Sequence, residues 1–208
     1  SLRSLAFRAC AVSDWTPVTM LTSLEDLQLY YCGLNNLSAF SNLTGLRNLG
    51  IQENGITDIA AVAFMPLLED LRMTGNPVGN LDALSTLTLL TYLDADSCAL
   101  TNITALSGLT RLKQVNLSGN LLTNIDALAG LDLWTVFLDM NVLDVSAGSA
   151  ALSVIQTLQS RGAWVSYENQ QTAPSIYSQP VSQLALAGST VTFSVGANGA
   201  TAYQWRHN

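Results

Sequence analysis

The chain has 208 residues, of which 49% are hydrophobic and only 11% are charged, so it is long and apolar enough for a sizeable core. Its formal net charge is −7. This argues against nucleic acid, which requires a footprint of lysine and arginine, and against simple electrostatic attraction to anionic lipid. No apolar run reaches the roughly 18 residues of a transmembrane helix.

One phrase recurs along residues 2–146 at a nearly fixed period. Each copy has apolar residues at its first, fourth and sixth places and Asn or Cys at its ninth, as in LKQVNLSGN at residues 112–120. The period is 22 residues and shortens to 21 before the last copy. The copies begin at Leu2, Leu24, Leu46, Leu68, Leu90, Leu112 and Leu133. This period, with these apolar places, is the leucine-rich repeat signature.

The first half of each copy predicts a short strand. Residues 26–30 read DLQLY, where two leucines alternate with outward residues, and such alternation gives one buried and one exposed face. A single strand of this length is not stable alone, but stacked copies make a parallel sheet with a continuous core. The return arm adds inward residues, which in the third copy are Ile56, Ile59, Val62 and Met65. We therefore predict an α/β-type repeat solenoid, curved, with its parallel sheet on the concave face.

The first copy is the most irregular, because Trp15 replaces the usual Leu or Ile and Pro17 limits helix in its return arm. Most copies carry Asn or Asp at the thirteenth place, where a side chain can bond the local backbone and hold the turn of the arm. These residues are Asp14, Asn36, Asp58, Asn80, Asn102 and Asn124. A polar stripe for a ligand is the alternative interpretation.

The ninth places are expected to form a ladder of side chains that point into the turn after each strand and satisfy backbone groups there. They are Cys10, Cys32, Asn54, Asn76, Cys98, Asn120 and Asn141. The cysteines are expected to be free thiols that behave as small hydrophobic residues. A Cys10–Cys32 disulfide stays open, since neighbouring strands lie about 4.8 Å apart, although the ladder does not naturally supply the required side-chain directions. Zinc is not expected, because no second Cys or His stands at ligand spacing.

After the last copy, Leu152, Ile155 and Leu158 have helical spacing within residues 146–162, and Gly162 can end that helix. Residues 164–169 then read as one more strand. A helix and a strand that cover the last copy are what the end of a solenoid needs. We therefore predict a repeat domain over residues 1–170, with a C-terminal helix–strand cap, followed by a linker over residues 171–175.

The repeats resemble the short leucine-rich repeats of bacterial internalins and related cell-surface proteins. The resemblance rests on L-x-x-L-x-L-x-x-N/C-x-L followed by T-N/D-I-x-x-L, as in LTNITAL at residues 100–106. It implies a non-enzymatic, partner-binding protein that is displayed on the bacterial surface or secreted.

The segment 176–208 resembles the start of an immunoglobulin-like domain of multi-domain bacterial surface proteins. The residues that carry this resemblance are Gln179, Pro180, Gly188, the expected strand 191–195, Tyr203 and Trp205. Gly196 and Gly199 mark an expected turn. Trp205 fits the tryptophan that packs on the inter-sheet disulfide of immunoglobulin domains, whereas Val195 stands where the first cysteine would be. With about three of the usual seven strands, the segment is expected to be a truncated domain.

Catalytic chemistry is not expected. The only histidine is His207, which makes a Ser/His/Asp or Cys/His set implausible, and the sequence has no phosphate-binding glycine motif. Asp94 and Asp96 face the same side of one strand. Calcium would require about six oxygen ligands, and only Asn116 and Asp139 are expected nearby, so a solvated acidic patch is the simpler interpretation. We predict no cofactor, no metal and no catalytic residue.

The remaining candidate is the exposed face of the sheet, because repeat solenoids bind through such concave faces and aromatic residues with arginine are typical interface anchors. The candidate partner-binding residues are Tyr30, Gln52, Arg72, Tyr92, Asp94, Asp96, Asn116, Phe137 and Asp139. The alternative is that Tyr and Phe there fill cross-strand pairs without a ligand. Burial of Tyr92 and Phe137 in the core would contradict the assumed register.

The sequence thus favours a protein-binding or adhesion module of a bacterial surface or secreted protein, expected to be a monomer whose partner is an unidentified protein. The alternative is an accessory module of a larger secreted enzyme, with the repeats as a spacer or a glycan-binding surface. It arises because both ends of the chain are expected to be cut. A third interpretation is a spacer without a specific ligand.

Overall fold

The computed structural model describes residues 2–12, 14–171, 175–178 and 190–198. By its internal contacts the chain divides into two compact units, Ser1–Gln170 and Gln171–Asn208. The first unit contains the seven copies of the repeat, and the second contains the C-terminal segment of the chain.

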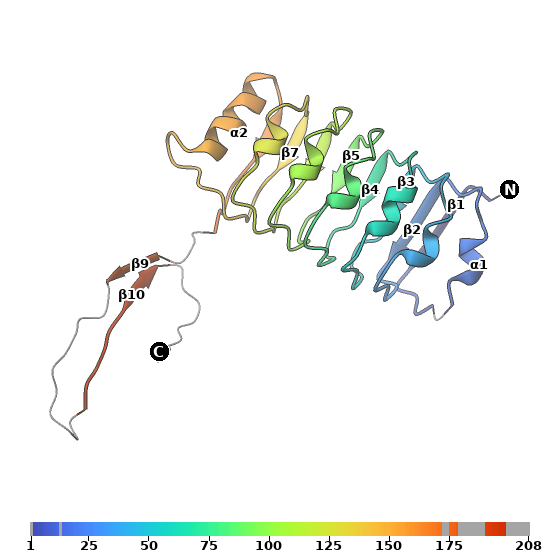
Figure 1. The fold of residues 1–208 in the computed structure, drawn as a ribbon, viewed down its shortest axis with the longest axis horizontal. Helices are drawn as coiled ribbons and strands as arrows, with labels where there is room; N and C mark the ends of the chain where they lie inside the picture. The colour runs from blue at the N-terminus through green and yellow to red at the C-terminus, as the bar shows by residue number, and fades with distance from the viewer. Residues whose placement is uncertain (1, 13, 172–174, 179–189, 199–208) are drawn as a thin grey trace. The chain divides into compact units, whose positions relative to one another are not determined.

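The first unit is built on one open, parallel sheet of eight strands that succeed one another in chain order (Figure 1). The strands are β1 (Ser4–Arg8), β2 (Asp26–Tyr30), β3 (Asn48–Gly50), β4 (Asp70–Arg72), β5 (Tyr92–Asp94), β6 (Gln114–Asn116), β7 (Thr135–Phe137) and β8 (Trp164–Ser166). The second residues of the strands pair in one unbroken row from Leu5 to Val165. The predicted sheet of a leucine-rich repeat solenoid is confirmed.

The return arms of the copies pass through short helices that form a second row beside the strands (Figure 1). They are α1 (Thr16–Thr19), η1 (Ser38–Phe40), η2 (Ala60–Phe64), η3 (Asp82–Leu84), η4 (Thr104–Leu106) and η5 (Asp126–Leu128), where η marks a 3₁₀ helix. At the start of η4, Asn102 Oδ1 accepts a hydrogen bond of 2.8 Å from the Thr104 backbone N–H. The other thirteenth-place residues accept the same bond in their copies. These side chains therefore hold the turns of the arms, as the sequence predicts.

Between the strands and the arms lies one continuous core of apolar side chains. The inward residues predicted for the third arm, Ile56, Ile59, Val62 and Met65, are all buried. In the irregular first copy, the Trp15 ring packs edge-to-face on Phe7 and Phe40, with centroid distances of 5.5 and 5.7 Å. Burying one such large apolar side chain contributes roughly 1.5–3 kcal/mol. Because the core is continuous across the copies, each copy depends on its neighbours for part of this stabilisation.

Each copy leaves its strand through a left-handed residue at its eighth place. Positive φ angles occur at Ala9, Tyr31, Glu53, Gly75, Ser97, Gly119 and Met140. At Gly119, a Cβ atom would lie 2.6 Å from Ser97 Oγ and 2.9 Å from Asp96 Oδ1, so a larger residue there would have to displace these two side chains. Glycine adopts this conformation at the lowest cost, although five other copies hold a non-glycine residue at the eighth place. This turn aims the ninth-place side chain back into the stack.

The ninth-place asparagines join adjacent copies. Asn120 Oδ1 accepts hydrogen bonds from the backbone N–H groups of Cys98 (3.0 Å) and Leu100 (2.9 Å) in the preceding copy. Its Nδ2 donates to the carbonyl oxygens of Ala95, Leu117 and Ser118. Asn54, Asn76 and Asn141 make corresponding bonds.

The thiols reproduce only half of this pattern. Cys98 Sγ donates to the carbonyl oxygen of Met73 at 3.3 Å, but a thiol is a weak acceptor, and the Val78 N–H bonds the carbonyl of Asn76 instead. Cys10, Cys32 and Cys98 are free in the structure. Burial raises the pKa of the Cys98 thiol to about 12, so Cys98 stays protonated at neutral pH.

A longer helix, α2 (Ala150–Ser160), replaces the return arm between β7 and β8. It begins where Ser149 Oγ accepts a hydrogen bond of 3.3 Å from the Leu152 N–H, and it buries Val154, Ile155 and Leu158. Gly162, with a φ of +95°, then turns the chain into β8. That strand ends at Ser166, three residues earlier than the expected strand 164–169.

In the second unit, β9 (Ser175–Ser178) pairs antiparallel with β10 (Gly196–Asn198). The strand therefore includes Gly196, for which the sequence predicts a turn, whereas residues 191–195, for which it predicts a strand, do not form one. Because β9 pairs with the residues that follow this stretch, the alternation in the sequence locates the strand too early in the chain. The expectations at Gln179, Pro180, Gly188, Gly199, Tyr203, Trp205 and His207 lie outside the described residues.

Candidate binding face

The outer sheet face is the surface formed by the third, fifth and seventh places of the copies, together with Trp164, Ser166 and Glu168 on and after β8. Its side chains alternate with buried ones, as on β2, where Leu27 and Leu29 are fully buried between partly exposed neighbours. Tyr92 and Phe137, which test the register, both belong to this face: Tyr92 is half-buried and Phe137 is 36% exposed.

At the N-terminal end of the face, polar side chains bond one another. The Tyr30 hydroxyl donates to Gln28 Oε1, and Gln28 Nε2 donates to Asp26 Oδ1 at 2.6 Å. Gln28 lies across the neighbouring strand at Gly50, where an added Cβ atom would be 1.9 Å from Gln28 Oε1. The missing side chain of Gly50 thus makes room for this chain of hydrogen bonds. In the same copy, Gln52 has a buried Oε1 without a hydrogen-bond partner in the described part of the structure.

At the middle of the face, Arg72 is fixed between a carboxylate and a ring. Its Nε and Nη2 donate to the two oxygens of Asp70, each at 2.9 Å, and its guanidinium lies 4.9 Å from the centroid of the Tyr92 ring. The hydrogen bonds to Asp70 raise the pKa of Arg72 further above its usual value. Burial is the main cause that raises the pKa of Tyr92, so Tyr92 stays neutral at physiological pH. Arg72 therefore already has an anion and an aromatic partner within its own chain.

Asp94 and Asp96 come next on the face. Asp94 Oδ1 accepts the Asp96 N–H at 3.4 Å, and Asp96 Oδ1 accepts the Ser97 hydroxyl at 2.6 Å. Burial is the largest cause that raises the pKa of Asp94. Neither carboxylate belongs to any of the salt bridges found among the described residues. Within those residues, no group of three or more His, Cys, Asp or Glu side chains could hold a metal ion.

At the C-terminal end of the face, two aromatic rings form an open pair. Phe137 on β7 and Trp164 on β8 pack edge-to-face, with centroids 5.0 Å apart, and 56% of Trp164 is exposed. Beside them, Asp139 Oδ1 accepts hydrogen bonds of 2.7 Å from the Ser166 hydroxyl and the Glu168 N–H. Trp164 was not among the sequence-predicted face residues, although its alternation with the buried Val165 was a signal that could have placed it there.

The structure brings part of the predicted set into one row across the strands. At the fifth place, Arg72 pairs in register with Asp94, Asp94 with Asn116, and Asn116 with Phe137. Tyr30 and Gln52 lie on earlier copies at the seventh place, outside this row. Asn116 Oδ1 accepts the Ser118 N–H at 3.1 Å, which fixes its side chain within its own turn.

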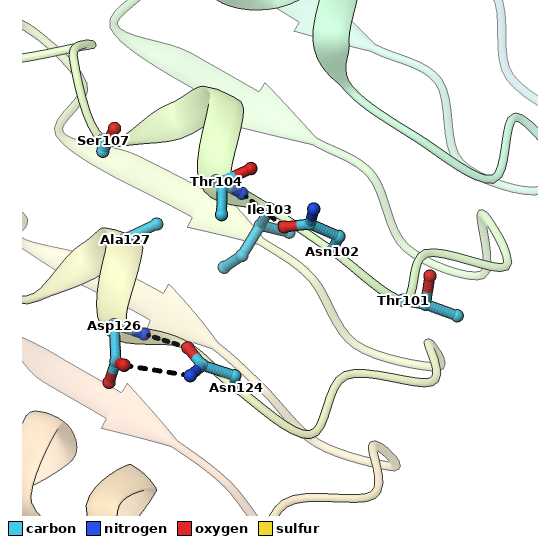
Figure 2. Close-up of a pocket in the computed structure, with 8 residues that line it drawn as sticks. All are labelled: Thr101, Asn102, Ile103, Thr104, Ser107, Asn124, Asp126 and Ala127. Carbon is cyan, nitrogen blue, oxygen red and sulfur yellow. Dashed lines mark hydrogen bonds between the residues drawn. The ribbon is translucent and has the colours of Figure 1, made fainter.

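Shallow pockets recur between neighbouring return arms, away from the sheet. Figure 2 shows one of them, between η4 and η5, where Asn102 and Asn124 bond the backbone N–H groups of Thr104 and Asp126. An equivalent pocket lies between η2 and η3. Because the polar side chains in these pockets hold their own turns and recur with the repeat, the pockets are a consequence of the stacking.

Comparison with known proteins supports this architecture. A family model described as leucine-rich repeats, in two copies, matches residues 88–130. A comparison with curated proteins finds no match.

The solved structures that share the fold include two internalins and a further leucine-rich repeat protein. An internalin (inlF) from Listeria monocytogenes is 26% identical, with a TM-score of 0.68 over 80% of this chain and 47% of that one. Internalin C2 (inlC2) from the same species is 24% identical, with a TM-score of 0.56 over 68% of this chain and 60% of that one. A leucine-rich repeat protein from Leptospira interrogans is 20% identical, with a TM-score of 0.66 over 81% of this chain and 44% of that one.

The chain thus spans less than two thirds of each of these structures. Its fold is an internalin-like leucine-rich repeat solenoid, a class that generally binds proteins and is typically not enzymatic. In the described part of the chain, no helix is long and apolar enough to cross a membrane.

Proposed function

We propose that the chain is a protein-binding and adhesion module of a bacterial surface or secreted protein, and that it binds its partner through the concave sheet face without catalysis. The outer sheet face carries the proposal, because it presents Tyr92 with Arg72 and the open pair Phe137 and Trp164 on a rigid sheet. Aromatic residues and arginine dominate the hot spots of protein interfaces. The polar groups of the return arms, in contrast, are bonded within their own turns.

The setting and the domain limits belong to the same proposal. Residues 1–170 form the repeat domain, with α2 and β8 as its C-terminal cap, because α2 buries an apolar side against the last copy and β8 covers the edge of β7. Residues 171–175 are the linker, and 176–208 are the start of an immunoglobulin-like domain. The module works as a monomer on the bacterial surface or in the secreted fraction, without a cofactor.

A second candidate is a glycan-binding accessory module of a larger secreted enzyme. The exposed ring of Trp164, next to the oriented carboxylate of Asp139, favours it, because a flat ring flanked by hydrogen-bond acceptors suits the apolar face and hydroxyls of a sugar.

A binding assay with the full chain separates the two functions. The immobilised chain is probed with purified extracellular-matrix and cell-surface proteins, and separately with soluble oligosaccharides. The test variant is Tyr92→Ala/Phe137→Ala/Trp164→Ala, and the matched control is Phe64→Ala, an aromatic residue on η2 that is 61% exposed. We expect capture of a protein, at least about 10-fold weaker in the triple variant and unchanged in the control. Protein capture that is equal in both variants would remove the outer sheet face from the function.

A further inference from the structure

The charges on the outer sheet face are distributed unequally. From β5 to β8, its outward places carry four carboxylates, Asp94, Asp96, Asp139 and Glu168, and no lysine or arginine. The last cation on the face in chain order is Arg72, which is held by Asp70. The C-terminal half of the face is therefore an acidic surface that carries no basic residue of its own and has Arg72 only at its border, beside Asp94, so its charge favours a cationic partner.

Two cationic side chains of this chain show how a carboxylate and an aromatic ring together bind a cation elsewhere in the molecule. Arg72 lies between the Asp70 carboxylate and the Tyr92 ring, 4.9 Å from its centroid. In the same way, Lys113 Nζ donates to Asp132 Oδ2 at 2.6 Å and lies 5.7 Å from the centroid of the Trp134 ring. Both sites combine a carboxylate, an aromatic ring and a cation.

The C-terminal end of the face has the first two of these groups without the third. Trp164 and Phe137 supply the rings, and Asp139, oriented by Ser166 and the Glu168 N–H, supplies the carboxylate. An exposed ring face attracts the ammonium or guanidinium group of a basic side chain and packs on its alkyl part. Because the rings are already packed against each other and the carboxylate is already oriented, binding a cation here requires little further ordering.

We propose that the C-terminal half of the outer sheet face binds a basic segment of the partner protein, with one cationic side chain between Asp139 and the Phe137–Trp164 pair and a second at Asp94 and Asp96. This inference rests on the proposed protein-binding function and specifies the chemistry of the partner. Asp94 and Phe137 are two strands apart in register, which is about 10 Å. An extended segment covers that distance in roughly three residues.

The test titrates the full 208-residue chain with a synthetic peptide that carries two arginines three residues apart, and measures binding by isothermal titration calorimetry, a readout that does not depend on Trp164. A peptide with glutamate in place of arginine and a neutral cello-oligosaccharide are the comparison probes. We expect saturable binding of the arginine peptide that weakens with added salt. Asp139→Asn keeps the Oδ1 acceptor and removes the charge, and together with Trp164→Ala it should weaken binding about 10-fold or more. The off-face pair Asp58→Asn/Phe64→Ala should leave binding unchanged.

Each outcome decides the matter. No arginine-peptide binding, together with protein capture that still depends on Tyr92, Phe137 and Trp164, overturns the basic partner and leaves the proposed function standing. Equal losses in the face variant and the off-face variant reveal non-specific attraction to an acidic protein and overturn the site. Preferential binding of the oligosaccharide through Trp164 overturns both the basic partner and the protein-binding proposal.

Discussion

The ninth-place asparagines and the carboxylates of the outer sheet face can stand as close as two residues apart, as Asn141 and Asp139 do, yet they serve different ends. Asn120 is 1% exposed and its side chain bonds backbone groups of two copies. Asp139 is partly exposed and bonds only the neighbouring turn. A polar side chain that bonds backbone groups of two copies stabilises the stack. A carboxylate that is bonded on one side only keeps acceptor capacity for a partner. Substitutions at both sets can test this division.

The largest effect on stability is expected at the ninth-place asparagines. Asn120→Ala removes all five side-chain hydrogen bonds and leaves the N–H groups of Cys98 and Leu100 buried without acceptors. We expect the free energy of unfolding to fall by about 3 kcal/mol or more, measured by urea denaturation monitored by far-UV circular dichroism.

Two further substitutions calibrate that loss. Asn120→Cys should be milder than Asn120→Ala, because a thiol can still donate to the carbonyls, as Cys98 does to Met73. Asn124→Ala, at an exposed arm turn with bonds to Asp126 only, should lose about 0.5–1 kcal/mol. If Asn124→Ala were as damaging as Asn120→Ala, burial between copies would not be what makes the ladder cohesive.

An intermediate effect is expected at Gly50, where the outer face itself is close-packed. Gly50→Ala places a methyl group where Gln28 now lies and should destabilise the chain by about 1–2 kcal/mol while it breaks the Tyr30–Gln28 bond. In a Gln28→Ala background the same change should become nearly neutral, because the only close contact left is the Tyr30 hydroxyl at 2.9 Å, which no longer bonds Gln28, and because alanine is preferred to glycine in a strand. The coupling is read from a double-mutant cycle, and additive losses would contradict the packing explanation.

A smaller effect on stability is expected at the aromatic pair. Trp164→Ala removes an edge-to-face contact with Phe137 that is worth about 0.5–1.5 kcal/mol, while much of the ring is already in water. Thermal unfolding should therefore change little while binding is lost. A large drop in the midpoint temperature of unfolding would mean that the aromatic pair serves to stabilise the C-terminal end of the array and not to bind a partner.

The smallest effect is a pH dependence at Asp94. Because burial raises the pKa of this carboxyl above its usual 3.8 in the unfolded chain, the folded state holds the proton more tightly, and stability falls as pH rises from 3.8 through the raised pKa. Asp94→Asn should therefore be more stable than the unsubstituted chain at pH 7. The difference in unfolding free energy should shrink as the pH is lowered toward 3.8, and a difference that grows on acidification would reverse the sign of the burial effect.

The period made much of this structure predictable. Seven copies in register determine which residues are inward, so the buried places of the third arm and the outward position of Phe137 can be found by counting. Counting fails where the period is broken: α2 inserts a longer arm before β8, and Trp164 was therefore not assigned to the outer face. Nor can a pattern decide which carboxylate Arg72 binds or that Gln28 occupies the space over Gly50, because those choices depend on side-chain geometry between copies. In the second unit, which has no period, alternation predicts a strand over residues 191–195, whereas the strand of the structure is Gly196–Asn198.

The unbroken register of the strands also fixes the distances between sites on the outer sheet face. Every copy adds one strand, so the span between the Arg72–Tyr92 site and the Phe137–Trp164 pair is a whole number of strand spacings of about 4.8 Å. Deleting or duplicating a 22-residue copy between the two sites would change that distance by one strand spacing and leave the side chains at both sites unchanged. The affinity of a partner that contacts both sites would therefore change stepwise with the number of copies between them. Gain or loss of a repeat in the gene would thus alter how well the partner fits.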